Sequence, residues 1–112
     1  MFGSKPHPEM TPAEVHAALG TGRVVLVDVR EAAEHDAERI DGALLRPLSS
    51  FQPKALPVTE GASVILHCGS AKRSATALDM CRKAGVPVTT HMAGGLMGWK
   101  AAGLPTVVGG SH

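Results

Sequence analysis

Hydrophobic residues form short uninterrupted runs along this chain, and segments of mixed polarity separate the runs. The runs near 24–28 and 63–67 are largely aliphatic, without alternation of polar and apolar positions, a pattern typical of parallel strands that are covered on both faces. Two shorter runs, near 43–46 and 88–92, predict further strands. Because helix-forming segments lie between the runs, the sequence predicts an α/β fold around a parallel sheet.

Capping signals place the first helix. Thr11 has the side chain of an N-cap, Pro12 suits the first helical position, and Glu14 completes a capping box. Gly20 is expected to end this short helix.

The remaining segments complete the predicted layout. Helices are predicted within 31–39, over 75–84 and over 96–102, and a loop with a helical turn within 49–61. Trp99 is expected to anchor the core, because the chain has few large side chains. We expect one domain over residues 10–106, with an N-terminal lead-in at 1–9 that is either frayed or ordered by contact with the domain, and a C-terminal tail at 107–112.

One cysteine occupies the position where a buried strand gives way to a helix. The apolar run ends at Cys68, and a short loop containing Lys72 and Arg73 follows. Backbone N–H groups in such a loop converge on one point, and the helix N-terminus adds partial positive charge there. We therefore expect a lowered pKa for Cys68, a thiolate nucleophile near neutral pH, and an anion-binding loop around it.

A structural interpretation of the same loop stays open. Cys68 would then be a buried, inert cysteine, and Lys72 and Arg73 would be solvated surface charges. Cys81 lies inside the predicted helix that follows, where a position in the core is expected.

Charged residues also stand at the end of the first long strand. Asp28 and Arg30 are expected at the carboxyl edge of the sheet, where ligands bind in open α/β folds. They either support a site there or form a local salt bridge or turn cap. His35 and Arg46 could bind a ligand, but each is isolated along the chain, and solvation at the surface is the preferred interpretation.

Composition and charge argue against several classes of function. The net charge is +1, basic residues are dispersed, and only one Trp and two Phe are present, which argues against nucleic-acid binding. No apolar run suits a signal peptide or a membrane span, and two cysteines do not make a disulfide framework, so a cytoplasmic protein is expected. We expect no metal and no cofactor, because the six histidines and two cysteines show no tight ligand spacing.

Three separated motifs resemble those of single-domain rhodaneses, a family of sulfurtransferase modules. The first motif comprises Asp28-Val29-Arg30-Glu31, Glu34-His35, Ile40-Asp41-Gly42-Ala43 and Pro47. The active-site loop is matched by Cys68-Gly69-Ser70-Ala71-Lys72-Arg73-Ser74, and the C-terminal signature by Gly94-Gly95, Trp99 and Gly103-Leu104-Pro105. The resemblance spans about residues 10–106. It implies a rhodanese-like fold with a central parallel sheet of about five strands and helices on both faces.

Two positions depart from the pattern of the family. Glu38-Arg39 stands where members often have Gly-His, which concerns local packing only. Ala71 stands where many members have a glycine. If this position needs a positive φ, alanine is strained there and the shape of the loop changes.

The resemblance implies a ping-pong transfer of sulfur by a thiosulfate sulfurtransferase. Cys68 would take sulfane sulfur from thiosulfate or a related persulfide donor, carry it as a persulfide, and pass it to cyanide or a thiol. The N–H groups of residues 69–73 would hold the persulfide, while Lys72 and Arg73 attract the donor and stabilise departing sulfite. Ser74 is expected to cap the helix or support the loop. The implied substrate-binding residues are Gly69, Ser70, Ala71, Lys72, Arg73 and Ser74, with Asp28 and Arg30 in support.

Alternatives from other classes stay open. A persulfide relay to a protein acceptor, or a binding module for a protein partner, would use the same fold, although binding modules of this family usually lack the cysteine. Cysteine phosphatases and arsenate reductases also begin their loop with His-Cys, as in His67-Cys68. They place one more residue between cysteine and arginine than the four present here. The smaller ring suits a sulfur atom better than a phosphoryl group.

Overall fold

A five-stranded parallel sheet forms the centre of the protein, with the strand order β1-β6-β5-β2-β4. This computed structural model describes residues 7–109. The strands of the sheet are β1 (Glu9–Met10), β2 (Val24–Asp28), β4 (Leu44–Leu45), β5 (Ser63–His67) and β6 (Thr90–Met92). A separate small sheet pairs β3 (Glu38–Arg39) antiparallel with β7 (Val107–Val108). The predicted α/β fold with about five parallel strands is confirmed.

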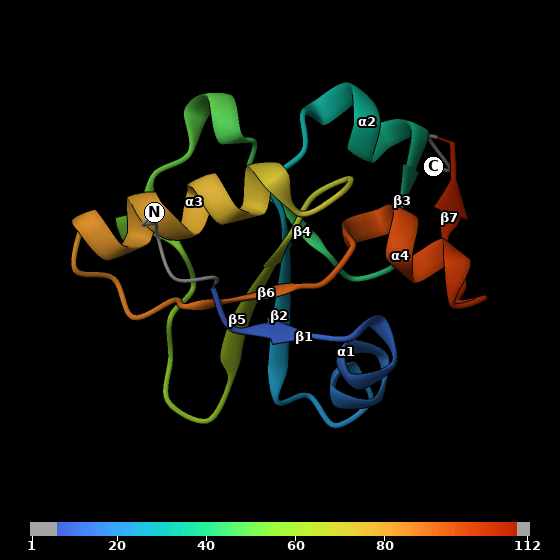
Figure 1. Cartoon of the computed structure of the whole chain (residues 1–112), viewed down its shortest axis with the longest axis horizontal. Helices are drawn as coiled ribbons and strands as arrows, with labels where there is room; N and C mark the ends of the chain where they lie inside the picture. The colour runs from blue at the N-terminus through green and yellow to red at the C-terminus, as the bar shows by residue number, and fades with distance from the viewer. Residues whose placement is uncertain (1–6, 110–112) are drawn as a thin grey trace, which may run out of the picture.

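Helices cover the central sheet on both faces (Figure 1). The helices are α1 (Pro12–Leu19), α2 (Ala32–Ala37), α3 (Lys72–Lys83) and α4 (Gly95–Ala101), with the short 3-10 helices η1 (Leu48–Ser50) and η2 (Pro53–Ala55). Helices α1 and α4 contact each other, while α3 contacts η2. The chain therefore has the layers that the alternation of strands and helices predicts.

Strand β5 contributes to two hydrophobic cores, one on each face of the sheet. Val64 and Leu66 pack in the core that includes Leu78 of α3, whereas Ile65 packs with Trp99 of α4. Successive side chains of a strand point to opposite faces. A strand that is buried on both faces needs apolar residues at consecutive positions, which explains the uninterrupted run. Trp99 is only 1% exposed, as its predicted role in the core requires.

The capping box that predicts the first helix is present. The Glu14 N–H donates to Thr11 Oγ1 at 3.1 Å, and Glu14 Oε1 accepts from the Thr11 N–H at 2.8 Å. Other element bounds differ from the predictions. Strands β4 and β6 are shorter than predicted, and α3 begins at Lys72 rather than at Ala75.

Strands occupy parts of the predicted lead-in and tail, so where the structure describes the lead-in it is ordered by contact rather than frayed, and the described part of the tail pairs with the domain. Glu9 pairs with His91 of β6, and Val107 pairs with Arg39 of β3, a position that was predicted to be helical. Each pairing satisfies backbone groups that a frayed segment would leave to water. Residues 1–6 and 110–112 of the predicted lead-in and tail lie outside the described residues.

The register of the two central strands places charged groups beside the candidate site. Strands β2 and β5 pair along their whole length, and Asp28 lies opposite His67. Both strands end at this edge, so the residues that follow them, Val29 and Cys68, lie at the carboxyl edge of the sheet.

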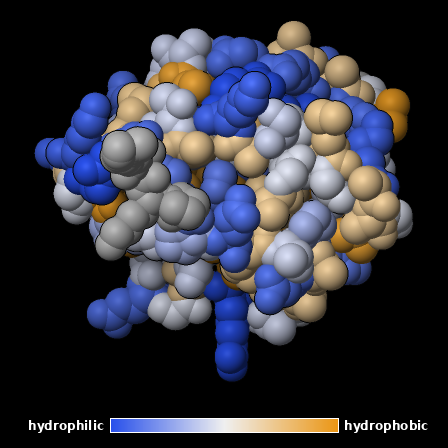
Figure 2. Space-filling view, in the orientation of Figure 1, coloured by the Kyte–Doolittle hydropathy of each residue, from blue (hydrophilic) through white to orange (hydrophobic). Residues whose placement is uncertain are grey.

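Apolar and hydrophilic residues are interspersed over the surface in Figure 2, with apolar residues more frequent on the side of α1 and α4. Within residues 7–109, the exposed large hydrophobic residues are Leu44, Val58, Met97 and Val108. They come from different parts of the fold. None of the helices described is both long enough and apolar enough to cross a membrane.

Candidate active site

Cys68 follows directly after β5 and is fully buried. Its Sγ accepts hydrogen bonds from the backbone N–H groups of Ala71 at 3.1 Å and Ser74 at 3.3 Å. Burial raises the pKa of the Cys68 thiol, but hydrogen bonds from Ser74, Ser70 and Ala71 outweigh burial, and the pKa is lowered overall. The surroundings of Cys68 therefore favour a thiolate, whereas the surroundings of an inert core cysteine would favour the neutral thiol. By contrast, burial alone raises the pKa of Cys81.

The ring of donors around the sulfur includes a residue of the helix itself. Ser74 lies in the first turn of α3, beyond the range 69–73 expected to hold the sulfur. It is not the N-cap, which is Ala71, so the capping role predicted for Ser74 is wrong. Its Oγ lies 3.2 Å from the Ala71 carbonyl, so the side chain packs against the loop and supports it instead.

Ala71 adopts a left-handed backbone conformation, with φ of 89°. Among residues 7–109 it is the only residue other than glycine with a positive φ. Position 71 therefore needs the conformation for which glycine is suited, and the alanine is strained there by about 1 kcal/mol. The loop nevertheless keeps the Ala71 N–H on Sγ.

Helix α4 holds the other side of the active-site loop. The N–H of Leu96 donates to the Cys68 carbonyl at 2.7 Å, and the N–H of Met97 donates to the Gly69 carbonyl at 3.1 Å. At Gly95, a Cβ atom would lie 2.4 Å from the Cys68 carbonyl oxygen. Only glycine allows this approach, so two motifs that are separate in the sequence form one structural unit.

Arg73 is paired with a carboxylate from another element. Its guanidinium donates to Glu34 of α2 at 2.7 and 3.0 Å. Hydrogen bonds from Arg73 lower the pKa of Glu34 to about 2. One guanidinium nitrogen lies beside Gly69, 3.2 Å from where a Cβ would be. The cation thus lies against the loop, with part of its charge neutralised, while Lys72 is exposed at the start of α3.

A buried ionic cluster supports the edge of the sheet next to the loop. Asp28 binds the Arg30 guanidinium, with a shortest distance of 2.8 Å, and accepts from the Arg30 backbone N–H at 2.9 Å. The predicted local salt bridge and turn cap are both present. His35 Nδ1 lies 2.9 Å from Asp28 Oδ2, so its predicted solvation is wrong, whereas Arg46 is exposed. Burial raises the pKa of Asp28, but hydrogen bonds from Arg30, together with His67 and His35, lower it overall.

His67 joins this cluster to the active-site loop. Its Nδ1 lies 3.1 Å from the Cys68 carbonyl, and its Nε2 lies 3.9 Å from Asp28. Burial lowers the pKa of His67, which favours a neutral ring that donates from Nδ1. His67 Nε2 has no hydrogen-bond partner among the described residues.

Two side chains that contact the loop or the start of α3 could not be identified from the residues alone. His91 Nδ1 lies 2.7 Å from Ser74 Oγ, and Glu34 holds Arg73. Glu34 appears in the first motif of the resemblance, but its partner lies 39 positions away. The position of His91 within a predicted strand is the available signal for it. No group of three or more His, Cys, Asp or Glu residues within 7–109 is arranged to hold a metal ion.

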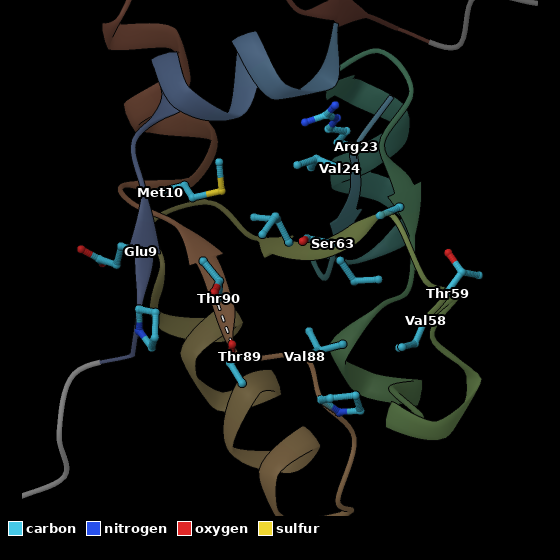
Figure 3. Close-up of a pocket in the computed structure, with 15 residues that line it drawn as sticks. Glu9, Met10, Arg23, Val24, Val58, Thr59, Ser63, Val88, Thr89 and Thr90 are labelled. Atoms are coloured by element: carbon cyan, nitrogen blue, oxygen red, sulfur yellow. Dashed lines mark hydrogen bonds between the residues drawn. The ribbon is translucent and has the colours of Figure 1, made fainter. Parts of the chain in front are cut away.

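A hollow of about 680 Å³ lies at the opposite edge of the sheet, where the parallel strands begin. Figure 3 shows Glu9, Ser63 and Thr90 around it, together with Val88 and aliphatic neighbours. Its lining holds no cysteine or histidine. We therefore place the candidate active site at Cys68 and not in this hollow.

Several proteins from other organisms are similar to this chain in sequence. Over 84 residues the chain is 50% identical to an uncharacterized protein of Synechocystis, slr1261, covering 75% of this chain and 47% of that protein. It is 34% identical over 102 residues to the probable adenylyltransferase/sulfurtransferase MoeZ of Mycobacterium tuberculosis, covering 88% and 26%. A sulfurtransferase of Allochromatium vinosum is 30% identical over 87 residues, covering 78% and 81%. The chain spans less than half the length of the first two proteins.

Solved structures and a family model complete the comparison. The structure of a thiosulfate sulfurtransferase from Pseudomonas aeruginosa has a TM-score of 0.78 at 27% identity, covering 97% of this chain and 21% of that one. A rhodanese-related protein from Thermoplasma volcanium has a TM-score of 0.76 at 22% identity, covering 90% and 98%, a likeness of fold alone. The model of the Rhodanese-like domain matches residues 11–102. This match covers most of the chain, which therefore belongs to the family of rhodanese-like domains.

Proposed function

We propose that this domain is a sulfurtransferase that carries sulfane sulfur on Cys68, with thiosulfate or a related persulfide as donor and cyanide or a thiol as acceptor. The observation that carries the proposal is the pair of backbone N–H groups, from Ala71 and Ser74, that bind Cys68 Sγ. They stabilise negative charge on sulfur. The sulfurtransferases among the relatives support the same reaction.

In the first half of the proposed reaction, the Cys68 thiolate attacks the outer sulfur of thiosulfate. The sulfur–sulfur bond of the donor breaks, and sulfite leaves with the bonding electrons. Lys72 and Arg73 draw in the dianionic donor and stabilise the departing sulfite. Cys68 has no exposed surface, so part of the loop, Gly69 and Ser70 included, must move for the donor to reach Sγ.

In the second half, a cyanide ion or a thiolate attacks the outer sulfur of the persulfide, and Cys68 leaves as a thiolate. The donors that favour the Cys68 thiolate as a nucleophile also make it a better leaving group, because a thiol of lower pKa leaves faster. Asp28 and Arg30 support the edge of the sheet on which the loop stands. A protein acceptor fits the same chemistry, and we place the reaction in the cytoplasm, where thiols stay reduced.

Mass spectrometry of the intact protein tests the proposal. After incubation with thiosulfate and removal of the excess, the wild type should gain one sulfur atom, which a thiol reductant removes. Cys68→Ser should gain none, and Cys81→Ser should behave as the wild type. Sulfur found on Cys81, or retained by Cys68→Ser, would show that Cys68 is not the carrier. A comparison of rates with thiosulfate and with a protein persulfide then identifies the preferred donor.

A further inference from the structure

A line of four side chains connects the buried thiol with the protein surface. Cys68 Sγ lies 3.6 Å from Ser74 Oγ, which lies 2.7 Å from His91 Nδ1. The other ring nitrogen of His91 lies 3.6 Å from the carboxylate of Glu9. Cys68, Ser74 and His91 are buried, whereas the Glu9 side chain is 52% exposed. The proposed sulfur-transfer steps do not involve His91 or Glu9.

The charges around this line determine which nitrogen of His91 is free. Burial lowers the pKa of His91, Glu9 opposes this, and His7 adds to the lowering. The His7 ring stands edge-on to His91 at 6.0 Å, and its Nε2 is bound by Asp79 at 3.1 Å. On the thiol side, the nearby charge is that of Arg73. A neutral His91 that directs Nε2–H towards Glu9 leaves Nδ1 free to accept the Ser74 hydroxyl proton.

We propose that Ser74 and His91 form a proton path that leads from Cys68 towards Glu9, and that the proton held on His91 at the end of this path raises the fraction of Cys68 present as thiolate. In the thiol state, S–H donates to Ser74 Oγ and the Ser74 hydroxyl donates to His91 Nδ1. Ser74 takes the thiol proton as it gives its own to Nδ1, which leaves a thiolate and an imidazolium. The hydrogen bonds then run in the opposite direction, from Nδ1–H to Ser74 and from Ser74 to Sγ.

This path deepens the proposed function, because the thiolate it forms is both the nucleophile and the leaving group of sulfur transfer. His91 is a positioning residue in this scheme, since it acts through Ser74 and does not touch the reacting sulfur. The titrations of Cys68 and His91 are then coupled, and each group favours the charged form of the other.

Ultraviolet absorbance of the thiolate, measured against pH, tests the path without any sulfur transfer. A Cys81→Ala background leaves Cys68 as the only thiol. In this background, His91→Leu and His91→Asn should each raise the Cys68 titration midpoint by about one pH unit. Ser74→Ala should raise it similarly, and the Ser74→Ala, His91→Leu double variant should show no further shift. His16→Leu, a histidine change on the opposite helix α1, should leave the midpoint unchanged.

Two further measurements keep the test decisive if His91→Leu does not fold. Glu9→Gln changes an exposed residue and should lower the thiolate fraction at neutral pH about twofold. NMR titration of His91 should show a lower pKa in Cys68→Ser than in the wild type, because no thiolate then stabilises the imidazolium. An unchanged Cys68 midpoint in folded His91→Asn, or additive shifts from Ser74 and His91, would overturn the proton path. Either result would leave the mass-spectrometry test of Cys68 unaffected.

Discussion

Arg73 is bound to Glu34 by two hydrogen bonds, at 2.7 and 3.0 Å, although Arg73 lies in the first turn of α3 and Glu34 in α2. The pair fixes the guanidinium beside Gly69 and reduces its net charge. A planar guanidinium held in this bidentate way has little freedom to follow a substrate. The role of Arg73 towards an anionic donor therefore depends on how strongly Glu34 competes for it.

Arg73→Ala should raise the KM for thiosulfate about tenfold, because one charge-assisted contact with the donor is lost. Glu34→Gln should have the opposite effect and lower KM about twofold at low ionic strength, since it unmasks the guanidinium charge. Initial rates over a range of thiosulfate and salt concentrations measure both effects. If the two variants raise KM alike, the pair serves to brace the loop rather than to attract the donor.

The same pair should contribute to stability in a defined range of pH. The folded-state pKa of Glu34 is about 2, against an ordinary value of 4.5. A carboxylate with a lowered pKa stabilises the fold fully above its ordinary pKa, and this contribution is lost as pH falls towards the folded-state value. Urea unfolding of wild type and Glu34→Gln should differ by about 0.5–1 kcal/mol at pH 6, allowing for solvent screening. The difference should disappear near pH 2, and a constant difference would contradict this account.

The buried pair of Asp28 and Arg30 should contribute more to the free energy of unfolding than the more exposed pair of Arg73 and Glu34. Asp28→Asn leaves the Arg30 guanidinium buried without its counterion, and we expect a loss of about 3 kcal/mol in the free energy of unfolding. Asp36→Asn, on the exposed face of α2, is the matched control and should change stability by less than about 0.5 kcal/mol. Denaturant unfolding measures both. A loss below about 1 kcal/mol for Asp28→Asn would show that the cluster tolerates an uncompensated Arg30.

Features that depend on local sequence could be predicted, because their causes lie within a few residues. The long strands β2 and β5 have the predicted bounds, since burial on both faces leaves an uninterrupted apolar run. The capping box of α1 is likewise local. The thiol at the end of β5 could be placed at the sheet edge because parallel strands end together there.

Features that depend on distant pairing could not be predicted. Strand β1 consists of two residues and is recognised only by its register with His91. The contact between Ser74 and His91 requires the positions of both α3 and β6, which no pattern in either segment reports. The positive φ of Ala71 could be predicted only conditionally, from the glycine that many family members have at this position, because alanine itself carries no signal for it.

Replacing the strained alanine should stabilise the protein. Ala71→Gly relieves the cost of a left-handed conformation, partly offset by the greater freedom of glycine in the unfolded chain, and we expect a gain of about 0.5–1 kcal/mol. Ala75→Gly, inside α3, should instead lose about 1 kcal/mol. Thermal and denaturant unfolding compare the two. A destabilised Ala71→Gly variant would mean that the Ala71 methyl group makes packing contacts that outweigh the backbone strain.

The contact between α4 and the loop should be the least tolerant of added volume. Gly95→Ala and Gly103→Ala both place an alanine at a positive φ, but a Cβ at Gly95 meets the Cys68 carbonyl at 2.4 Å, whereas nothing lies within 4 Å at Gly103. The two variants therefore share the backbone strain and differ in the clash. Gly95→Ala should lose about 2 kcal/mol more in the free energy of unfolding, because the loop must shift. The shift would also misplace the N–H groups on Sγ, so its Cys68 thiol pKa should rise while that of Gly103→Ala stays unchanged. Equal losses in the two variants, with no change in thiol pKa, would show that the loop and α4 are not mechanically coupled.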